Sequence, residues 1–554
     1  MLKIINYLGL ILLIFRPFIC EQVFPVCGIM FNLVFTVVFF SKLIVDKNIK
    51  TSKTIVIIIF FIFVFFICQI IFSINIYNTC NVLCYLFTLV IIYMFVDSLE
   101  SEKQEFLIKA MVAISFIIAL RGAYQYLFGL NLINKIFSEE QIAKESLYAF
   151  ELLKRRRIVS WFTTPNLLAS YLLMFIPLAL AQIDFDKNNI LKVKNIFYFL
   201  GFICIFFAVL FAKVIAVYLV IIFLISCFFI KKFTIKSQIA HKNSFLFIAA
   251  FFVISGGVFF AERASAFLLN DINNSIIQRL YYWQATLRII KNNLFFGLGL
   301  GNFGIVYPFY KNSYANETIY VHNSYLQLFA ETGIIFFLTA VSLLGCSLRN
   351  LFKNEDQKLT IALSFSCAAF LIHNLVSYSF FIMQVCFVWV VLFACLFSKV
   401  TNREENYKKL KKLFNFLVKA AISFIIISNG LFLISEINLK KGIELLKKAQ
   451  YDQARQSIKY ALNFIPFNDV AYYCLAINAK REANNNFSNE VVKNFKKAII
   501  HNPYYVYYYF YLGEYYKQHD FLAWAKDYLA MASRLYPTNK KFRIELDAVI
   551  KKGQ

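Results

Sequence analysis

Charged residues are scarce in this sequence. Asp, Glu, Lys and Arg make up only 16% of the 554 residues, while hydrophobic residues make up 60%. A soluble domain is about one quarter charged. The apolar residues come in runs of roughly 18 to 25, the length that crosses about 30 Å of hydrocarbon as a helix. Repeated runs exclude a soluble protein with a single signal peptide and indicate an integral membrane protein.

Acidic residues are rarer than basic residues. There are 31 Asp and Glu against 57 Lys and Arg, which gives a formal net charge of +26. The positive charge lies largely in short loops between apolar runs and not in a basic domain, so it argues against nucleic-acid binding. The twelve Cys residues lie mostly inside apolar runs and show neither zinc spacing nor a disulfide framework, so they are interpreted as packing residues.

Thirteen apolar runs are interpreted as membrane spans. They lie near residues 4–20, 22–41, 54–77, 80–97, 106–129, 163–183, 195–212, 214–230, 244–261, 324–347, 359–377, 379–398 and 420–436. Five intervening loops are basic: 42–53, 184–194, 231–242, 349–358 and 399–412. If the spans alternate, all five loops fall on one side, which the positive-inside rule makes cytoplasmic. Two long loops, near 130–162 and 262–323, and the C-terminal region then face outward.

The sequence therefore predicts an all-α protein with two parts. Residues 1–436 form a polytopic bundle of about 12–13 transmembrane helices, and residues 437–554 form a charged, Tyr-rich tail. Pro466, Pro503 and Pro537 recur in this tail at a spacing of 37 and 34 residues. Small residues precede them where two helices would cross: Gly442, Ala454, Ala461, Ala498, Gly513, Ala525 and Ala532. This period predicts a tetratricopeptide-like α-solenoid, which would bind a partner on its concave face or cap the membrane domain.

Cations gather in the segments predicted to face outward. They are Arg157, Lys213, Arg279 and Arg288, together with His322. Arg157 ends a basic run in an outer loop, against the charge rule, which suggests either a functional role or contact with lipid headgroups. Lys213 lies between apolar runs, where a cation must reach water or an anion. Carboxylates are sparse in this region and form neither a glycosidase pair nor a metal cluster. Cations without acids suit an anionic substrate such as a diphosphate.

His322 and a glycine run are the other notable features of the second outer loop. His322 begins a helix that re-enters the membrane, so it is either a general base or hydrogen-bond donor, or a structural histidine. The run at 297–301 could be read as a dinucleotide-binding fingerprint. It lacks the third glycine at the required place, and no βαβ unit surrounds it. A tight turn at the membrane surface fits the glycines better.

The order of these motifs resembles the O-antigen ligase and polymerase superfamily over roughly residues 110–400. The resemblance rests on polytopic topology and on four stretches: Arg157–Ala169, Arg279–Trp283, Gly297–Phe303 and Val321–Gly333. It implies a bacterial inner-membrane glycosyltransferase of lipopolysaccharide biosynthesis that needs no metal or nucleotide cofactor. Such enzymes take a glycan from an undecaprenyl-diphosphate carrier on the periplasmic side. They pass it to lipid A core, to a growing carrier-linked glycan or to a protein hydroxyl.

The resemblance also implies roles for individual residues. His322 falls on the catalytic histidine, and Arg279 on an arginine linked to the donor diphosphate. Lys213 falls where relatives usually carry arginine, so the charge is kept and the bidentate fork is lost. Arg157 and Arg288 are expected to bind the same diphosphate. A late motif that often has His followed by Asp reads His373–Asn374 here, so it receives no role.

Other readings of the sequence stay open. Ligase and polymerase activities are not distinguished, and the outer tail would suit recruitment of a protein acceptor or another protein partner. A membrane transporter of a small anion or glycolipid is the second reading, since charges within membranes mark pathways. An assembly scaffold is the third, although thirteen spans are far more than an anchor needs. Membrane lipids are expected partners and nucleic acid is not.

Overall fold

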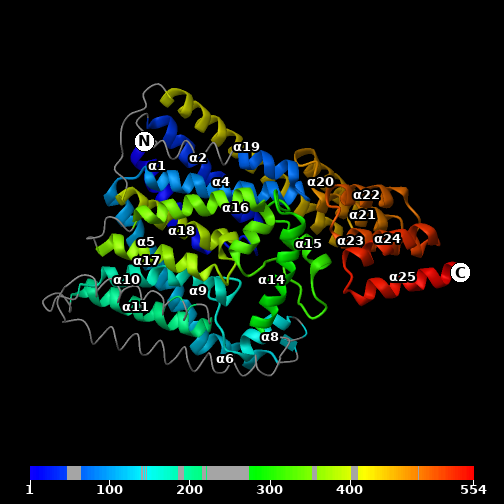
Figure 1. The fold of residues 1–554 in the computed structure, drawn as a ribbon, viewed down its shortest axis with the longest axis horizontal. Helices are drawn as coiled ribbons and strands as arrows, with labels where there is room; N and C mark the ends of the chain where they lie inside the picture. Colours follow the sequence, from blue (N-terminus) through cyan, green and yellow to red (C-terminus); the bar gives the residue numbers. More distant parts are fainter. Residues whose placement is uncertain are drawn as a thin grey trace.

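The computed structural model describes residues 1–46, 64–138, 146–184, 192–214, 274–351, 358–400, 410–484 and 486–554, with 141, 142, 144, 217 and 220. All regular elements in these residues are helical, and no strand occurs among them. The predicted all-α class is confirmed for this part of the chain. Figure 1 shows a large helical bundle from which a smaller set of C-terminal helices extends.

The helices of the bundle follow the apolar runs of the sequence. They are α1 (Leu2–Phe15), α2 (Pro25–Val45), α4 (Ile76–Asp97), α5 (Ser101–Tyr124), α9 (Pro165–Leu173), α10 (Phe175–Gln182), α11 (Val193–Ala212), α16 (Ser324–Leu351), α17 (Lys358–His373), α18 (Met383–Val400) and α19 (Leu410–Lys447). By length and composition, seven helical segments of the described residues could cross a membrane, and α17 and α18 are shorter apolar helices. These helices indicate a multi-pass membrane protein.

Two predicted spans, 214–230 and 244–261, fall almost entirely outside the described residues, and a third, 54–77, is described only from residue 64 onward. Each of the others coincides with a described helix, although the run at 163–183 forms two short helices, α9 and α10, that meet at Met174. The total of thirteen spans, and the orientation that depends on it, therefore stay predictions.

Shorter helices lie in the two segments that were predicted to face outward. They are α6 (Leu130–Ile136), α8 (Leu147–Lys154), α14 (Ser275–Asn292) and α15 (Phe303–Tyr310), while η2 (Gln125–Gly129), directly before α6, lies in the predicted span 106–129. Two further single turns, η1 (Arg16–Phe18) and η4 (Ser379–Phe381), connect helices of the bundle. The apolar core runs through α9, α10, α17 and α18, where many side chains are fully buried.

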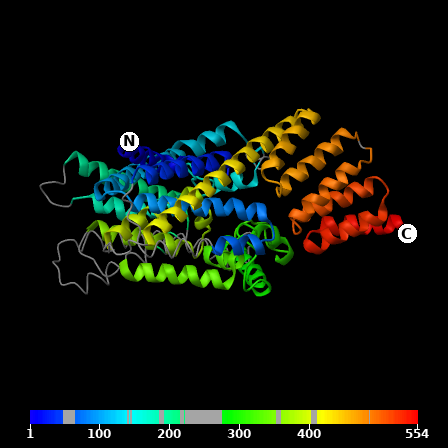
Figure 2. The same cartoon turned by 90° about the horizontal axis from the view of Figure 1, so that it is seen from above.

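The last helix of the bundle continues into the tail. Helix α19 has 38 residues and runs without interruption past residue 436, where the sequence placed the boundary between the two parts. Figure 2 shows this long helix crossing the bundle and reaching the C-terminal helices. The tail then consists of α20 (Tyr451–Phe464), α21 (Asp469–Glu482), α22 (Asn489–His501), α23 (Val506–Gln518), α24 (Leu522–Leu535) and α25 (Lys540–Gly553).

Successive tail helices pack against each other through small residues. A Cβ atom at Gly442 would lie 2.5 Å from Ile458, and one at Gly513 would lie 2.8 Å from Leu529. Ala525 and Ala532 are fully buried. Close helix contacts at these positions explain the recurring small residues, while the assignment to tetratricopeptide repeats stays a prediction.

The tail docks on the end of the bundle that carries α14 and α15. Asn75, which caps α4, donates from Nδ2 to Asp469 Oδ1 of the tail at 3.0 Å. Lys311, just after α15, donates to the Tyr536 hydroxyl at 3.1 Å. The Tyr77 hydroxyl of α4 donates to Glu436 at 2.6 Å. The tail and the segment 274–323 therefore lie at the same end of the helix bundle (Figure 1).

Candidate active site

His322 lies immediately before α16 in an unusual backbone conformation. Its φ of 58° is in the left-handed region, which residues other than glycine rarely adopt. The imidazole stacks against the Tyr282 ring with 5.7 Å between the ring centroids. The Tyr378 ring meets it edge-on at 4.9 Å. Two aromatic side chains, from α14 and from the loop between α17 and α18, thus hold the imidazole in place.

The two residues after His322 fix the start of α16. Asn323 Oδ1 accepts backbone N–H groups from the second and third residues after it, both at 3.0 Å, and so caps the helix. The N–H of Ser324 donates to the carbonyl of Asn374 at 3.0 Å. The Ser324 hydroxyl lies 2.7 Å from Asn374 Oδ1 and 3.0 Å from the carbonyl oxygen of Ser377. The loop after α17 therefore anchors the backbone next to His322.

A cavity of about 230 Å³ opens beside His322. Three cations line it: Arg157 from the first outer loop, Lys213 from the end of α11 and Arg279 from the first turns of α14. The rest of the described wall is neutral: Asn166, Val214, Ser275, Gln278, Tyr282 and Asn316. No described lining residue is a carboxylate. Such a wall favours an anionic ligand, and the volume lies below the roughly 300–1,000 Å³ of whole-ligand pockets, so it suits a charged head group.

Two of the cations tie their segments together. Arg157 Nε donates to the carbonyl oxygen of Ala212 at 3.1 Å. In the opposite direction, Lys213 Nζ donates to the carbonyl oxygen of Arg155 at 3.0 Å. The end of α11 and the basic run of the first outer loop are therefore joined by reciprocal bonds. Both charges stay at the cavity wall because each side chain also has a backbone anchor.

Backbone strain gathers around the cavity. Lys213 has a φ of 50° and Ser160 a φ of 52°, in addition to the 58° of His322. Each left-handed residue of this kind costs on the order of 1–3 kcal/mol and persists only where its surroundings enforce it. At Ser160 this is done by Gln125 Oε1, which accepts the Ser160 N–H at 2.9 Å, and by the Ser160 hydroxyl, which donates to Ile118. Strained residues cluster at functional sites, so their positions support a functional role.

Helix α14 presents one face to the cavity. Gln278 Nε2 donates to the carbonyl of Tyr314, and its Oε1 accepts the N–H of Asn316 at 2.8 Å, which ties the loop after α15 to the helix. Arg279 and Tyr282 are three residues apart and therefore share this side. Arg288 is nine residues after Arg279, about half a turn away around the axis. It is exposed and does not line the cavity.

The glycine-rich segment 297–301 supplies hydrogen bonds to α16 where that helix is interrupted. Helix α16 is interrupted at Gly333, where φ is 74° and ψ is 176°. The N–H groups of Leu298 and Gly299 donate to the carbonyl oxygens of Ala330 and Glu331 at 3.0 and 2.9 Å. The loop thus supplies hydrogen bonds that an unbroken helix would make internally, as irregular backbone at membrane depth requires.

This contact requires glycine on both sides. A Cβ atom at Gly297 would lie 2.4 Å from the carbonyl carbon of Glu331. One at Gly333 would lie 2.1 Å from the carbonyl oxygen of Phe295. Both residues also have positive φ angles, 71° and 74°. The glycines of the two motifs therefore serve the close approach of two backbones.

Glu331 organises the same loop. Its side chain is fully buried, and its carboxylate accepts the N–H of Gly301 at 2.9 Å, the N–H of Phe303 at 3.3 Å and Gln327 Nε2 at 3.2 Å. The carboxylate thus fixes the start of α15. It is a positioning residue for the loop that connects α14 with His322.

Its surroundings keep His322 in the neutral form. Burial, and then the positive charge of Arg279, lower the pKa of His322 to about 3. The imidazole is therefore neutral at neutral pH and can accept a proton. An anion bound at Arg279 would offset part of this effect and raise the pKa of His322 towards neutrality. Burial raises the pKa of Tyr282 to about 12, so that hydroxyl stays protonated.

The structure brings together four of the five predicted site residues. His322, Arg279, Lys213 and Arg157 line one cavity, and Arg288 does not join them. Within the described ranges, no group of three His, Cys, Asp or Glu could hold a metal ion. Sequence reasoning missed the neutral wall and the anchors of His322: Asn166, Gln278, Tyr282, Asn316, Asn374, Ser377 and Tyr378. Gln278 and Tyr282 lie beside Arg279 in the same motif, and this proximity could have indicated that they line the same cavity.

The fold and the site together define a multi-pass, all-α membrane protein in which three cations line a cavity beside a histidine. The model of the O-antigen ligase family matches residues 196–341. This range includes Lys213, Arg279, the glycine-rich segment and His322, and it excludes Arg157 and the tail. The chain is thus similar to O-antigen ligases over most of the candidate site, which supports glycan transfer of the ligase or polymerase type. No curated protein matches the chain.

Proposed function

We propose that this protein transfers a glycan from an undecaprenyl-diphosphate carrier to an acceptor hydroxyl at the periplasmic face of the bacterial inner membrane. The observation that carries the proposal is the cavity in which Arg157, Lys213 and Arg279 surround His322, with no carboxylate among its described lining residues. A diphosphate is a compact anion of the kind that such cations bind.

The residues divide the chemistry between them. The acceptor oxygen attacks the anomeric carbon of the donor glycan and forms the new glycosidic bond. The bond from that carbon to the carrier diphosphate breaks, and the electron pair leaves with the diphosphate. His322 accepts the proton of the acceptor hydroxyl, and the cations stabilise the charge on the leaving group. This single displacement inverts the anomeric centre and needs neither a metal nor a nucleotide cofactor.

The three cations differ in what they offer the diphosphate. Arg157 and Arg279 each present a planar fork that can bind two oxygens of one phosphate. Lys213 is a point charge, and its bond to the carbonyl of Arg155 holds it at the cavity edge. We expect the two arginines to set the orientation of the diphosphate and Lys213 to add charge.

The acceptor is lipid A core in a ligase, a second carrier-linked glycan in a polymerase, or a protein hydroxyl. A tail docked at the same end of the bundle as the cavity supports recruitment of the acceptor or of a protein partner there. The basic loops support a cytoplasmic position for the opposite end.

Replacement of His322 in the native host tests the proposal. We expect His322→Ala to leave the acceptor without glycan and to make the carrier-linked glycan accumulate. His519→Ala, a histidine in the tail outside the cavity, is the matched control and should retain normal glycan. Wild-type glycan on the acceptor in the His322→Ala strain would contradict the catalytic role. Loss of solute uptake without accumulation of carrier-linked glycan would favour a transporter.

A further inference from the structure

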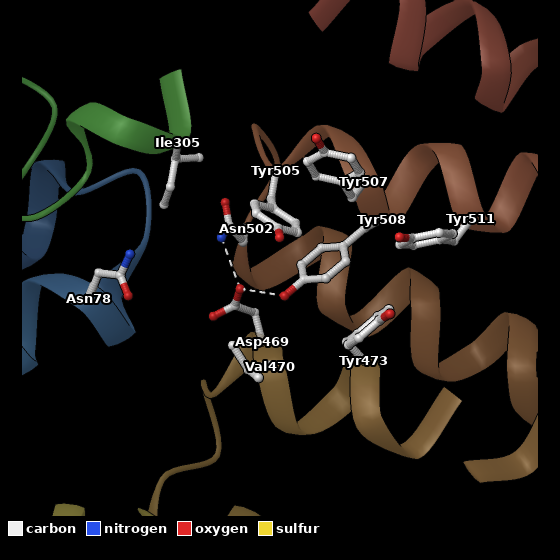
Figure 3. A pocket seen from close by; sticks show the side chains of 10 residues that line it. All are labelled: Asn78, Ile305, Asp469, Val470, Tyr473, Asn502, Tyr505, Tyr507, Tyr508 and Tyr511. Atoms are coloured by element: carbon white, nitrogen blue, oxygen red, sulfur yellow. Dashed lines mark hydrogen bonds between the residues drawn. The ribbon is translucent and has the colours of Figure 1, made fainter. Parts of the chain in front are cut away.

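A second cavity, here called the tyrosine pocket, lies where the tail meets the membrane domain. Its volume is about 360 Å³, within the roughly 300–1,000 Å³ typical of small-molecule sites. Figure 3 shows that Asn78 of α4 and Ile305 of α15 form one side, while residues of α21, of α23 and of the segment between α22 and α23 form the other. The pocket therefore depends on the docking of the tail.

Five tyrosine rings form a closed circuit on the tail side of this pocket. Neighbouring ring centroids are 4.6–6.2 Å apart in the order Tyr473, Tyr508, Tyr505, Tyr507, Tyr511 and back to Tyr473. All five line the pocket (Figure 3). Tyr505 and Tyr511 remain substantially exposed, at 37% and 40%. Such rings offer flat apolar faces next to polar hydroxyls.

The only charged group among the described lining residues already has its partners. Asp469 Oδ1 accepts from Asn75 at 3.0 Å. Its Oδ2 accepts from Asn502 Nδ2 at 2.9 Å and from the Tyr508 hydroxyl at 2.8 Å (Figure 3). These donors stabilise the carboxylate, so the pocket needs no cation to neutralise it. No Lys or Arg is among the lining residues that the structure describes, so this lining does not favour an anion.

Neutral polar groups are left to meet a ligand. Asn502 is 3% exposed, and its Oδ1 is buried without a hydrogen-bond partner in the described part of the chain. In Figure 3 this oxygen points away from Asp469, on the side of Ile305. A buried acceptor without a partner is unfavourable unless a donor from a ligand or water reaches it.

We infer that the tyrosine pocket binds a sugar segment of the glycan substrate. A sugar ring has C–H faces that lie against the negative faces of aromatic rings. Its hydroxyls both donate and accept hydrogen bonds, as do the tyrosine hydroxyls and the amides of Asn78 and Asn502. The inference rests on the proposed function, because it takes the bound sugar to be part of the transferred glycan or of the acceptor.

Helix α15 connects the tyrosine pocket with the cavity at His322. Ile305 of this helix lines the tyrosine pocket. The Tyr307 hydroxyl of the same helix donates to the carbonyl oxygen of Asn316 at 3.1 Å, and Asn316 lines the cavity at His322. A glycan bound by its diphosphate beside His322 would therefore pass α15 before its more distant sugars reach the tyrosines.

Saturation-transfer NMR with the full-length protein in nanodiscs tests the binding step. The probes are maltotetraose and chitotetraose, with tetramethylammonium as the cationic alternative. We expect saturation of sugar protons with the wild-type protein and with His322→Ala. Tyr505→Ala should weaken the affinity about fivefold or more. Tyr504→Ala is the matched control, because Tyr504 is 39% exposed and adjacent but does not line the pocket.

Tyr511→Phe is a second, milder variant that removes only a hydroxyl, so it tests the pocket even if Tyr505→Ala does not fold. It should weaken binding about twofold or more. Saturation of tetramethylammonium without saturation of either sugar would overturn the inference. Equal sugar binding by Tyr505→Ala and Tyr504→Ala would also overturn it. Because His322→Ala should bind the probes without transferring glycan, failure of this inference is separable from failure of the proposed function.

A transfer assay identifies the source of the bound sugar. We expect Tyr505→Ala to raise the KM for a carrier that bears several sugars, and to leave the KM unchanged for a carrier that bears one. If Tyr505→Ala had the same KM as the wild-type protein for the carrier that bears several sugars, this would contradict binding of the substrate glycan in the tyrosine pocket.

Discussion

The two cavities of this protein differ in almost every property that determines a ligand. The cavity at His322 is lined by three cations and no described carboxylate, and strained backbone surrounds it. The tyrosine pocket is larger, has one carboxylate with its own donors, and presents five aromatic rings. The first suits the charged diphosphate of a lipid-linked glycan and the second suits its sugars. A single lipid-linked glycan would therefore account for both sites if one cavity binds its diphosphate and the other binds its sugars.

The two cavities also differ in how the chain builds them. The cations come from three segments, and Arg157 is 165 residues before His322 in the sequence. Most of the tyrosine pocket comes from one short segment, 502–511, together with α21. The first cavity therefore requires the fold of the whole membrane domain. The second requires the tail and its contact with α4.

The largest expected effect is on glycan transfer, and it should involve the cavity at His322 but not the tyrosine pocket. His322→Ala should lower the rate of glycan transfer by about 100- to 10,000-fold, the usual contribution of general acid–base catalysis. Oligosaccharide binding at the tyrosine pocket should not change. Transfer by purified protein and saturation-transfer NMR measure the two quantities. A parallel loss of both would show that the variant perturbs the fold and that the cavities are not independent.

The next effect compares two arginines of α14. Arg279→Ala should lower transfer about 100-fold, since it removes a donor that stabilises the leaving diphosphate. Arg288→Ala should change transfer by less than about twofold, because Arg288 lies on the opposite, exposed side of the helix. Initial rates at saturating donor measure both variants. Equal losses would contradict the placement of the cavity on one face of α14.

The pH dependence of transfer sharpens the contrast further, because only one cavity contains a histidine. Burial and Arg279 lower the pKa of His322 to about 3, so the base stays deprotonated when the pH falls from 7.5 to 5.5. The value of kcat/KM, which reports the free enzyme, should then change less than about twofold in this range.

An ordinary histidine pKa of 6.5 would instead leave only about one tenth of the base deprotonated at pH 5.5. A tenfold loss of kcat/KM in the wild-type protein would therefore contradict the lowered pKa. Arg279→Gln removes the neighbouring charge, so it should raise the pKa of His322 and move the acid limb to higher pH.

The smallest expected effect concerns the anchor of His322. Ser324→Ala removes the hydroxyl that reaches Asn374 and Ser377, and should lower the free energy of unfolding by about 1 kcal/mol. Transfer should fall several-fold, because the backbone beside His322 is less constrained. Ser364→Ala, whose hydroxyl only bonds within α17, is the matched control. Thermal unfolding and kcat measure both variants, and an unchanged kcat in Ser324→Ala would rule out a positioning role.

Local patterns in the sequence predicted much of the fold. Apolar runs predicted most of the described membrane helices, because helix length and hydrophobicity are set residue by residue. The break of α16 at Gly333 was not predicted, since its hydrogen bonds come from residues 294–299 and not from the helix itself. The uninterrupted course of α19 into the tail was missed for a related reason: composition changes near residue 436, but the backbone does not.

The sequence motifs identified the residues that line the cavity at His322, while their roles stay predictions. His322, Arg279, Lys213 and Arg157 were recognised and do meet. Arg288 was included for its charge alone, and helical periodicity turns it away from Arg279. Asn374 was given no role because it stands where the family motif often has an acid. Its contact with Ser324, 50 residues away in the sequence, arises only in the fold.

The most direct measurement uses purified protein in nanodiscs with a glycan on undecaprenyl diphosphate and an acceptor glycolipid. It follows the release of undecaprenyl diphosphate and the formation of the new glycosidic bond in one reaction. We expect the two products in equal amounts from the wild-type protein, and neither at a comparable rate from His322→Ala or Arg279→Ala. Equal rates of both products in the wild-type protein and the two variants would contradict the assignment of this cavity as the transfer site.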